Sequence, residues 1–327
     1  MSMVWPTSTI SGITPGYAPG ARYFRFRSTL RLYQLWGTGT PAQARRRLER
    51  ERIPIASPAN LEEFALATVG PELYELFIRG YTAKQWKRAP RDLPPEIIKR
   101  IPFRNDFNDN YFGDPWQGLP SAGYTDGLFK SLLKNIPVKL ATDYLADRAW
   151  WDARARTVLY TGKVDEYFGY CRGQLEYVGL DFRHTTMQQP DFQGCPVMNY
   201  ADEEVPYTRI IEHKHFRPEG CTVPPAHEPT QRRRGRAADG NEVTVISYEE
   251  PNRARKNDLP CYPVPTAENK ARYAQYKKMR NGNCLFGGRL GDYRYYNMDE
   301  TIAAALKLAE KEKVKVATEV STIKFRR

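Results

Sequence analysis

The sequence predicts a mixed α and β fold that is built from more than one domain. Capped helical patterns dominate residues 40–100, and strand-like runs fill residues 165–265. A strand, two glycines and a helical pattern follow from Cys284 onward. The length of 327 residues exceeds that of an average domain. We therefore expect a helical domain, an antiparallel β-sheet domain and a further α/β part.

Cap residues and prolines mark the helices that we expect in the first third of the chain. Thr40 and Asn60 are suitable N-caps, and Gly70 is a suitable helix end. A short helix between prolines at 94–102 has few packing partners, so it could move as a lid. The predicted helices cover residues 40–52, 60–70, 71–80 and 94–102.

Strand-like runs with turn residues between them occupy the middle of the chain. They indicate a mainly antiparallel sheet. The basic, proline-rich insertion at 217–240 has no periodic pattern and is predicted to be a disordered loop. The predicted strands lie within residues 138–145, 157–162, 164–173, 175–187, 195–202, 207–216 and 242–251.

The last part of the chain combines a helix over 266–283, a strand that ends at Gly287-Gly288, and a second helix. The apolar stripe of this second helix consists of Ile302, Ala305, Leu306 and Ala309, and either Asn297 or Asp299 could cap it. A strand, a glycine turn and a helix N-terminus are typical of phosphate and cofactor sites. The signal is weak alone, because many β-α turns need glycine.

Composition narrows the class of protein. The net charge of +12 predicts attraction to anions, but the basic runs at 45–52 and 231–236 are typical of solvated faces, and no nucleic-acid reader motif is present. The five cysteines form no CxxC pair, which indicates reduced thiols and no zinc site. No apolar run is long enough to span a membrane. We expect a cytoplasmic protein with a flexible leader over residues 1–24.

Aromatic and basic side chains alternate between Phe77 and Tyr111. Flat rings bind bases and sugars, and guanidinium groups bind phosphate oxygens in pairs. A nucleotide ligand fits this combination. The alternative is a solvated basic loop with anchoring aromatic residues.

Few residues suggest protein-based acid/base or nucleophilic chemistry. The chain contains no GxSxG, HExxH or Walker A motif. His213 and His215 would share one face of a strand, either as a metal pair or as ordinary sheet histidines, and no third ligand stands at a suitable spacing. We predict no metal site. If the protein is an enzyme, a cofactor carries its chemistry.

Several motifs in the same order resemble UDP-galactopyranose mutase. They are GYTAKQW (80–86), LPPEIIKRIP (93–102), DNYF (109–112), GLPSAGYT (118–125), VPYTRIIEHKHF (205–216), YPV (262–264) and FGGRL with the tyrosines after it (286–296). The resemblance extends from about residue 35 to residue 312. It implies a flavoenzyme that interconverts UDP-galactopyranose and UDP-galactofuranose, in which N5 of reduced FAD attacks the anomeric carbon and displaces UDP.

The resemblance also assigns roles to individual residues. Arg100, on the lid, and Arg209, on the sheet, are expected to hold the diphosphate as the catalytic pair. The expected substrate-binding residues are Phe77, Tyr81, Thr82, Trp86, Tyr111, Asn199, Tyr262 and Tyr295. The expected flavin-binding residues are Arg289, Asn297 and Met298.

The chain also departs from the family pattern. It contains no GxGxxG turn, which in the family cradles the flavin diphosphate, so we expect a truncated copy with weak flavin binding or none. Val178 stands where the family has arginine, and Asn297 stands where it has aspartate. The implied domains are a helical domain with lid at 25–112, a remnant of a Rossmann-like FAD-binding domain at 113–164 and 283–327, and the antiparallel sheet domain at 165–282.

Two functions from different classes remain open on the sequence. The first is the mutase activity, impaired by the missing N-terminal unit. The second is a non-catalytic UDP-sugar-binding remnant, and a misfolding-prone fragment is a third possibility. The expected partners are the UDP-galactose isomers, with no nucleic acid and no membrane span, and a homodimer is left open.

Overall fold

The structure is a computed structural model that describes residues 9–11, 23–24, 36–38, 40–99, 123–216, 235–236, 242–254, 259–280 and 283–325. The chain divides into two compact units. Unit 1 comprises Met1–Lys139 and Leu180–Asn252, and unit 2 comprises Leu140–Gly179 and Arg253–Arg327. The predicted helical segment and most of the predicted antiparallel sheet therefore belong to the same unit.

The first two described helices of unit 1 are capped by residues that directly precede them in the sequence. The helices are α2 (Pro41–Glu51), α3 (Leu61–Leu73), the π-helix η1 (Tyr74–Arg79), α4 (Gly80–Trp86), η2 (Pro90–Asp92), α5 (Glu96–Lys99), the π-helix η3 (Gly123–Phe129) and α6 (Lys130–Leu132). Thr40 and Gln43 form a reciprocal capping box on α2, and Asn60 caps α3. Both predicted caps are confirmed.

The predicted helix end at Gly70 is also confirmed as a break in α3. Gly70 has a φ of +79°, which is accessible to glycine, and Pro71 restarts the helix. A Cβ on Gly70 would lie 2.6 Å from the carbonyl oxygen of Glu51, at the end of α2. The break therefore lets α2 and α3 approach each other.

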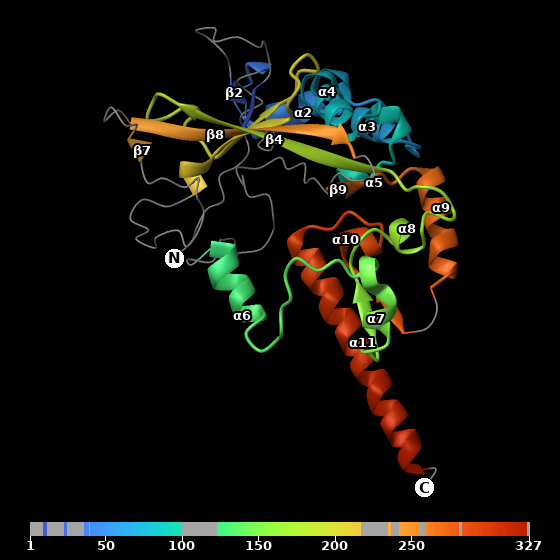
Figure 1. The fold of residues 1–327 in the computed structure, drawn as a ribbon. Coiled ribbons are helices and arrows are strands. Elements are labelled where there is room, and N and C mark those ends of the chain that lie inside the picture. Colours follow the sequence, from blue (N-terminus) through green and yellow to red (C-terminus); the bar gives the residue numbers. More distant parts are fainter. Residues whose placement is uncertain are drawn as a thin grey trace. The chain divides into compact units, whose positions relative to one another are not determined.

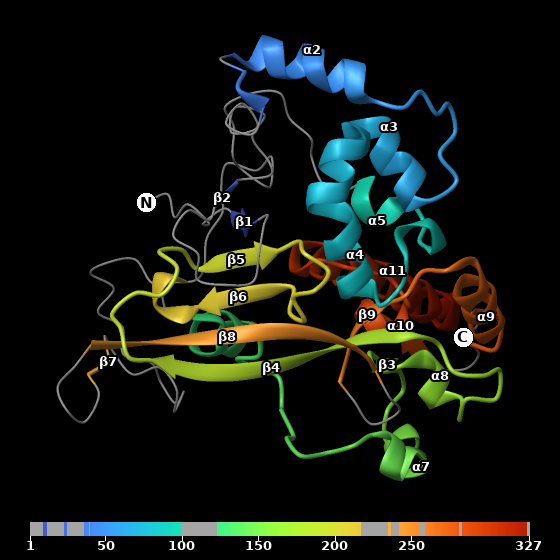
Figure 2. The ribbon, with the colours of Figure 1, turned by 90° about the horizontal axis from the view of Figure 1, so that it is seen from above.

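The sheet of unit 1 is mixed but mainly antiparallel (Figures 1 and 2). Its strand order is β2-β1-β5-β6-β8-β4, with β7 paired to β8, and β1 runs parallel to β5. The strands are β1 (Thr9–Ser11), β2 (Tyr23–Phe24), β4 (Tyr177–Met187), β5 (Val197–Tyr200), β6 (Arg209–Glu212), β7 (Gly235–Arg236) and β8 (Glu242–Arg253). Strands β1 and β2 fall in the segment that we predicted as a leader.

Unit 2 is built around an aromatic core. Its elements are η4 (Leu145–Asp147), α7 (Arg148–Asp152), β3 (Val158–Tyr160), α8 (Val164–Tyr167), β9 (Pro260–Pro263), α9 (Ala267–Lys278), β10 (Cys284–Phe286), α10 (Gly288–Gly291) and α11 (Met298–Phe325). Strands β3 and β10 form a parallel pair, and the first residues of β4 pair with β9. The buried cluster consists of Val164, Tyr167, Leu175, Tyr177, Tyr276, Phe286 and Tyr293.

Two strand predictions were wrong. Residues 138–144 form no strand, and Val138 and Leu140 are largely exposed, so their alternating pattern does not correspond to a buried face. Residues 164–167 form helix α8, because Val164 and Tyr167 at helical spacing enter the aromatic core. Most of the insertion at 217–240 lies outside the described residues.

The structure confirms a fold class that mixes helices with parallel and antiparallel strands. The parallel pair β3–β10 is the described part that corresponds to the predicted α/β portion, and its assignment as a Rossmann-like remnant stays a prediction. Among the helices that the structure describes, none has the length and apolar character that crossing a membrane requires.

Candidate functional site

Helix α4 lies against the connection between β5 and β6, and its residues Gly80 and Lys84 hold it there (Figure 2). A Cβ on Gly80 would overlap the carbonyl oxygen of Ala201, so only glycine permits this approach. One turn later, the Lys84 ammonium donates to the carbonyl oxygens of Tyr200 (2.8 Å) and Tyr207 (3.0 Å). The backbone around Tyr81 is therefore held close to the sheet.

Lys84 is a structural residue rather than an exposed cationic donor. Its side chain is buried, and this desolvation lowers its pKa from 10.5 to about 8, although the carboxylates of Asp202, Glu204 and Glu203 oppose the shift. Lys84 lies within the aromatic and basic segment from Phe77 to Tyr111 that predicts a nucleotide ligand, but its ammonium binds main-chain carbonyls.

Tyr81 and Arg209, both predicted site residues, are in direct contact. The Arg209 guanidinium donates from Nη2 to the Tyr81 hydroxyl at 2.9 Å. Its Nε lies 3.2 Å from Oε1 of Glu249 in an ion pair, and 29% of the Arg209 side chain is exposed. The two contacts orient one guanidinium between a helix and a neighbouring strand.

Strand register explains why these side chains meet. Asn199 on β5 pairs with Arg209 on β6, and Arg209 pairs with Glu249 on β8. Directly opposite residues of adjacent strands project to the same face of a sheet. The predicted substrate residue Asn199 is therefore a neighbour of Arg209, and both it and Glu249 are buried.

Burial and neighbouring side chains shift the pKa of the Glu249 carboxyl in opposite directions. Burial raises the pKa of the Glu249 carboxyl, while the Arg209 guanidinium and the Thr208 side chain act to lower it. A buried carboxyl of this kind needs its cation, and Arg209 is that cation. Glu249 is a positioning residue for Arg209.

The other predicted residues on the helices are packed inside unit 1. Phe77, Thr82 and Trp86 are all buried, each less than a tenth exposed. Phe77 belongs to η1, while Thr82 and Trp86 lie on α4 beside Tyr81. They are core residues of the same helical segment that carries Tyr81.

A second group of predicted residues meets in unit 2. The rings of Tyr262 and Tyr295 stack with centroids 5.3 Å apart and an interplanar angle of 18°. The Arg289 guanidinium carbon lies 5.4 Å from the Tyr262 centroid and 5.0 Å from that of Tyr295. Two predicted substrate residues and one predicted flavin residue thus form a single aromatic–cation cluster.

Arg289 is engaged with main-chain carbonyls. Its Nε and Nη2 donate to the carbonyl oxygen of Tyr296, and its Nη1 donates to that of Cys261 at 2.8 Å. The guanidinium thereby fixes the segment that leads into α11. All three guanidinium nitrogens therefore donate to main-chain carbonyl oxygens.

Asn297 and Met298 stand at the start of α11. The backbone N–H of Asn297 donates to the Glu300 carboxylate at 2.7 Å, and its carbonyl accepts from Thr301, so Asn297 occupies the predicted cap position. Met298 is exposed. The Gly287-Gly288 turn leads into the four-residue helix α10, which lies between the turn and α11 in the sequence.

Two predicted residues, Arg100 and Tyr111, lie outside the residues that the structure describes. Their roles stay predictions. The described members of the predicted site fall into one group in each unit, with Phe77, Tyr81, Thr82, Trp86, Asn199 and Arg209 in unit 1 and Tyr262, Arg289, Tyr295, Asn297 and Met298 in unit 2.

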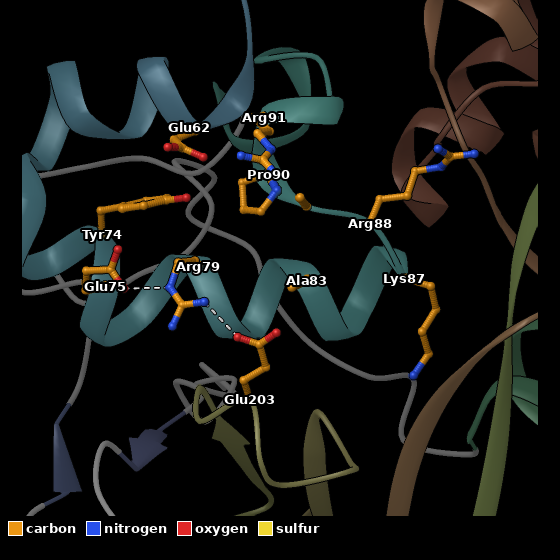
Figure 3. A pocket seen from close by; sticks show the side chains of 11 residues that line it. Glu62, Tyr74, Glu75, Arg79, Ala83, Lys87, Arg88, Pro90, Arg91 and Glu203 are labelled. Atoms are coloured by element: carbon orange, nitrogen blue, oxygen red, sulfur yellow. Dashed lines mark hydrogen bonds and ion pairs between the residues drawn. The ribbon is translucent and has the colours of Figure 1, made fainter.

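A cavity of about 530 Å³ opens on a different face of α4 (Figure 3). Arg79, Ala83 and Lys87 line it at four-residue spacing, together with Arg88 and Arg91. Arg79 is bound by the carboxylates of Glu75 at 2.6 Å and Glu203 at 2.7 Å. Among the predicted site residues that the structure describes, none lines this cavity.

The two histidines of the candidate metal pair point to different partners. Residues 213–216 form a 3₁₀ turn, η5, so the expected shared strand face was wrong. His213 Nε2 lies 2.5 Å from the Ser247 hydroxyl, whereas His215 Nε2 lies 3.3 Å from Glu212. The structure brings the potential ligand atoms of Asp191, Glu212 and His215 within 4.8 Å of one another, and the Lys214 ammonium forms ion pairs with both carboxylates.

Sequence reasoning missed the residues that build the site around Arg209. Gly80 sits in the GYTAKQW motif, but its role depends on the sheet that it approaches. Glu249 follows an apolar strand pattern as one of two adjacent glutamates, and only strand register shows which one faces Arg209. No local signal distinguishes them.

Comparison with known proteins identifies relatives of this chain. A family model described as UDP-galactopyranose mutase matches residues 76–295. A probable UDP-galactopyranose mutase of Klebsiella pneumoniae is 39% identical over 279 residues, which cover 84% of this chain and 66% of that protein. The dTDP-fucopyranose mutase of Escherichia coli is 34% identical over 279 residues, with 83% and 69% covered.

A crystal structure of a reduced UDP-galactopyranose mutase has a TM-score of 0.52 at 14% identity, and the match covers 89% of this chain and 73% of that one. At this identity it supports the fold alone. The chain spans about two thirds of the length of the curated relatives from Klebsiella and Escherichia. Because the family model covers most of the sequence, the chain belongs to the UDP-galactopyranose mutase family.

Proposed function

We propose that unit 1 binds the diphosphate of a UDP-sugar through Arg209, and that the chain acts as a mutase-type isomerase on UDP-galactopyranose and UDP-galactofuranose. The observation that carries the proposal is the guanidinium of Arg209, oriented by Glu249 at Nε and by Tyr81 at Nη2. Family membership supplies the substrate class and the reaction.

An oriented guanidinium suits a pyrophosphate for a physical reason. Its planar N–H groups match two phosphate oxygens at once, and fixing the plane beforehand reduces the entropy lost on binding. The ion pair with Glu249 and the hydrogen bond to Tyr81 hold the guanidinium, and because Arg209 remains partly exposed, an anion can reach it. An arginine held in this way is pre-organised for a charged group that leaves and returns during an isomerisation.

The aromatic residues extend this proposal to the rest of the substrate. Phe77, Tyr81, Thr82 and Trp86 would line the uridine and sugar site. The Asn199 side chain would form a hydrogen bond with the substrate beside Arg209. Tyr262 and Tyr295 in unit 2 would bind phosphate or sugar oxygens. Arg100 would join Arg209 on the diphosphate, and Tyr111 would bind the substrate with it.

The family activity implies FAD, and the described residues of unit 2 do not by themselves fit its diphosphate. The nitrogens of Arg289 donate to main-chain carbonyls. A Cβ placed on Gly287 would lie 3.3 Å from Leu159 Cδ1 and 3.6 Å from Leu308 Cδ2, so apolar side chains flank the glycine turn. We therefore assign no chemical step to a flavin held by Arg289, Asn297 and Met298 alone.

Isothermal titration calorimetry with UDP tests the proposal. We expect the purified chain to bind UDP, and Arg209→Ala to weaken binding by at least about tenfold, because a charged hydrogen bond contributes roughly 1.5–3 kcal/mol. Arg183→Ala is the matched control, since Arg183 lies on the same sheet but contacts Tyr248 and Glu250 on the opposite face.

The titrations can contradict the proposal or change its substrate class, and a separate assay measures the isomerase activity. Absence of UDP binding, or binding that Arg209→Ala leaves unchanged, would contradict the proposal. Tighter binding of dTDP than of UDP would shift the substrate class toward that of the Escherichia relative. Conversion of UDP-galactofuranose to UDP-galactopyranose with added FAD and dithionite, followed by chromatography, measures the isomerase activity itself.

A further inference from the structure

The Gln85 side chain is a buried amide with unpaired polar atoms. Gln85 lies on α4, and only 7% of its surface is exposed. Among the residues that the structure describes, neither its Oε1 nor its Nε2 has a hydrogen-bond partner. Buried polar groups are normally hydrogen-bonded, because leaving one unpaired costs free energy on folding. An unpaired amide at a buried position therefore points to a ligand that binds it.

Gln85 shares a face of α4 with Tyr81, the residue that holds Arg209. The two are four residues apart on the helix, so their side chains are neighbours. The Tyr81 hydroxyl accepts from Nη2 of Arg209. Gly80 and Lys84 lie on an adjacent side of α4 and contact the connection between β5 and β6. The unpaired amide thus belongs to the side of the helix where we propose that UDP binds.

A carboxamide is complementary to a group that has a hydrogen-bond donor and an acceptor side by side. The Nε2 of Gln85 donates and its Oε1 accepts, so the amide can form two parallel hydrogen bonds with such a group. Phosphate oxygens only accept, and sugar hydroxyls are not held in one plane. In a UDP-sugar, the uracil ring has the required pattern in one plane, at N3–H and O4.

The contact between Tyr81 and Arg209 places the base near Gln85. The hydroxyl end of the Tyr81 ring lies at Arg209, and the other end is attached to the helix that carries Gln85. A diphosphate at Arg209 leaves the face of this ring for the base, because aromatic rings stack on bases. The edge of a base in that position lies beside the Gln85 amide.

We propose that Gln85 binds the edge of the uracil ring, with Oε1 accepting from N3–H and Nε2 donating to O4. This inference rests on the proposed function, since it names the base contact of the same UDP site. The amide has no hydrogen bond to break within the described residues, and the rotatable bonds of the side chain let it turn toward the base. Binding therefore pairs polar groups that folding leaves unpaired.

The substitution Gln85→Met separates this role from a structural one. Methionine has a similar length and no amide to leave unpaired, so the variant should melt about 2–4 °C higher in differential scanning calorimetry. In isothermal titration calorimetry it should bind UDP about tenfold more weakly, because two hydrogen bonds are lost. A structural amide would instead lower the melting temperature when replaced. Gln275→Met, at an exposed position of α9, is the matched control and should change neither quantity.

Titration with 3-methyl-UDP locates the contact on the base. In this ligand a methyl group replaces the hydrogen on N3, so the wild type should bind it about tenfold more weakly than UDP. Gln85→Met should bind the two ligands within about twofold of each other, because the variant has no acceptor for N3–H. An equal preference for UDP in both proteins would show that another residue contacts N3.

The outcomes distinguish this inference from the proposed function. Unchanged UDP affinity in Gln85→Met, a lower melting temperature of that variant, or equal affinities of the wild type for UDP and 3-methyl-UDP would each overturn the inference. If Arg209→Ala still weakens UDP binding in that case, the diphosphate proposal stands and only the base contact is wrong. Absence of UDP binding by the wild type would overturn both.

Discussion

Arg209 is held at two of its nitrogens by residues of this chain alone. The Tyr81 hydroxyl accepts from Nη2, and the Glu249 carboxylate lies beside Nε. The first contact comes from a helix and the second from a strand, so the position of the Arg209 guanidinium depends on the packing of both elements. This arrangement makes the contribution of each partner separately measurable.

Tyr81→Phe should weaken UDP binding about three- to tenfold with little loss of stability. The substitution removes the hydroxyl that holds Nη2 while retaining the ring, and a neutral partner of a hydrogen bond contributes roughly 1 kcal/mol. Calorimetric titration with UDP measures the effect. Tyr273→Phe is a matched control, because the Tyr273 hydroxyl accepts from Arg280 in unit 2 at 2.9 Å. Equal affinities for Tyr81→Phe and wild type would argue against the assigned role.

Lys84 should give the protein a pH-dependent stability that Lys84→Met lacks. Its pKa is lowered from 10.5 to about 8, so between pH 8 and pH 10.5 the unfolded chain binds more protons at this residue than the folded chain does. Stability from this group therefore rises as the pH increases through that window, by at most about 3 kcal/mol. Its two acceptors are retained, since a neutral amine still carries two N–H donors.

Urea unfolding at pH 7.5 and pH 10 measures this effect as the difference between wild type and Lys84→Met. The wild type should gain stability relative to the variant at the higher pH. Lys270→Met, at an exposed helical position, is the control and should show no such gain. A difference that stays constant across the window would disprove the burial-based shift.

Element boundaries were predictable where the cause is local. Thr40 and Asn60 accept hydrogen bonds from backbone groups three residues away, so a cap can be identified from the sequence around it. The wrong assignment at residues 164–173 had the opposite cause. Val164 and Tyr167 also suit a strand, and only the aromatic core that they enter selects the helix.

Gly80→Ala should destabilise unit 1 and weaken UDP binding together. The added methyl group overlaps the carbonyl oxygen of Ala201, so α4 must move away from the sheet that carries Arg209. Overpacking of this kind costs about 1–3 kcal/mol, and differential scanning calorimetry should show a lower melting temperature.

Ala83→Gly separates stability from binding in the same helix. It should cost at most about 1 kcal/mol through helix propensity. Because Ala83 faces the cavity of Figure 3 and not Arg209, UDP affinity should be preserved. Retained affinity in Gly80→Ala, despite a lower melting temperature, would show that the approach of α4 does not position Tyr81.

Across the whole molecule, the predicted site residues fall into one cluster in each unit. Tyr81, Asn199 and Arg209 meet in unit 1, and Tyr262, Arg289 and Tyr295 meet in unit 2. The motifs that resemble the family identified these residues, but they could not show that Arg289 binds main-chain carbonyls. Hydrogen-bond partners of this kind are set by the folded backbone and leave no signal in a motif.

The exposed stripe of α11 shows the same limit in the other direction. Helical periodicity predicts which side chains share a face, and Ile302 and Leu306 do share one. Periodicity does not predict what covers that face. In the part of unit 2 that the structure describes, both side chains are exposed.

The position of the UDP diphosphate in a crystal structure of the complex tests the central claim most directly. The account predicts that phosphate oxygens lie within hydrogen-bond distance of the Arg209 guanidinium, about 2.7–3.2 Å, with the Glu249 ion pair retained. A diphosphate found instead at Lys87, Arg88 and Arg91 in the cavity of Figure 3, with Arg209 making no contact to it, would contradict the account.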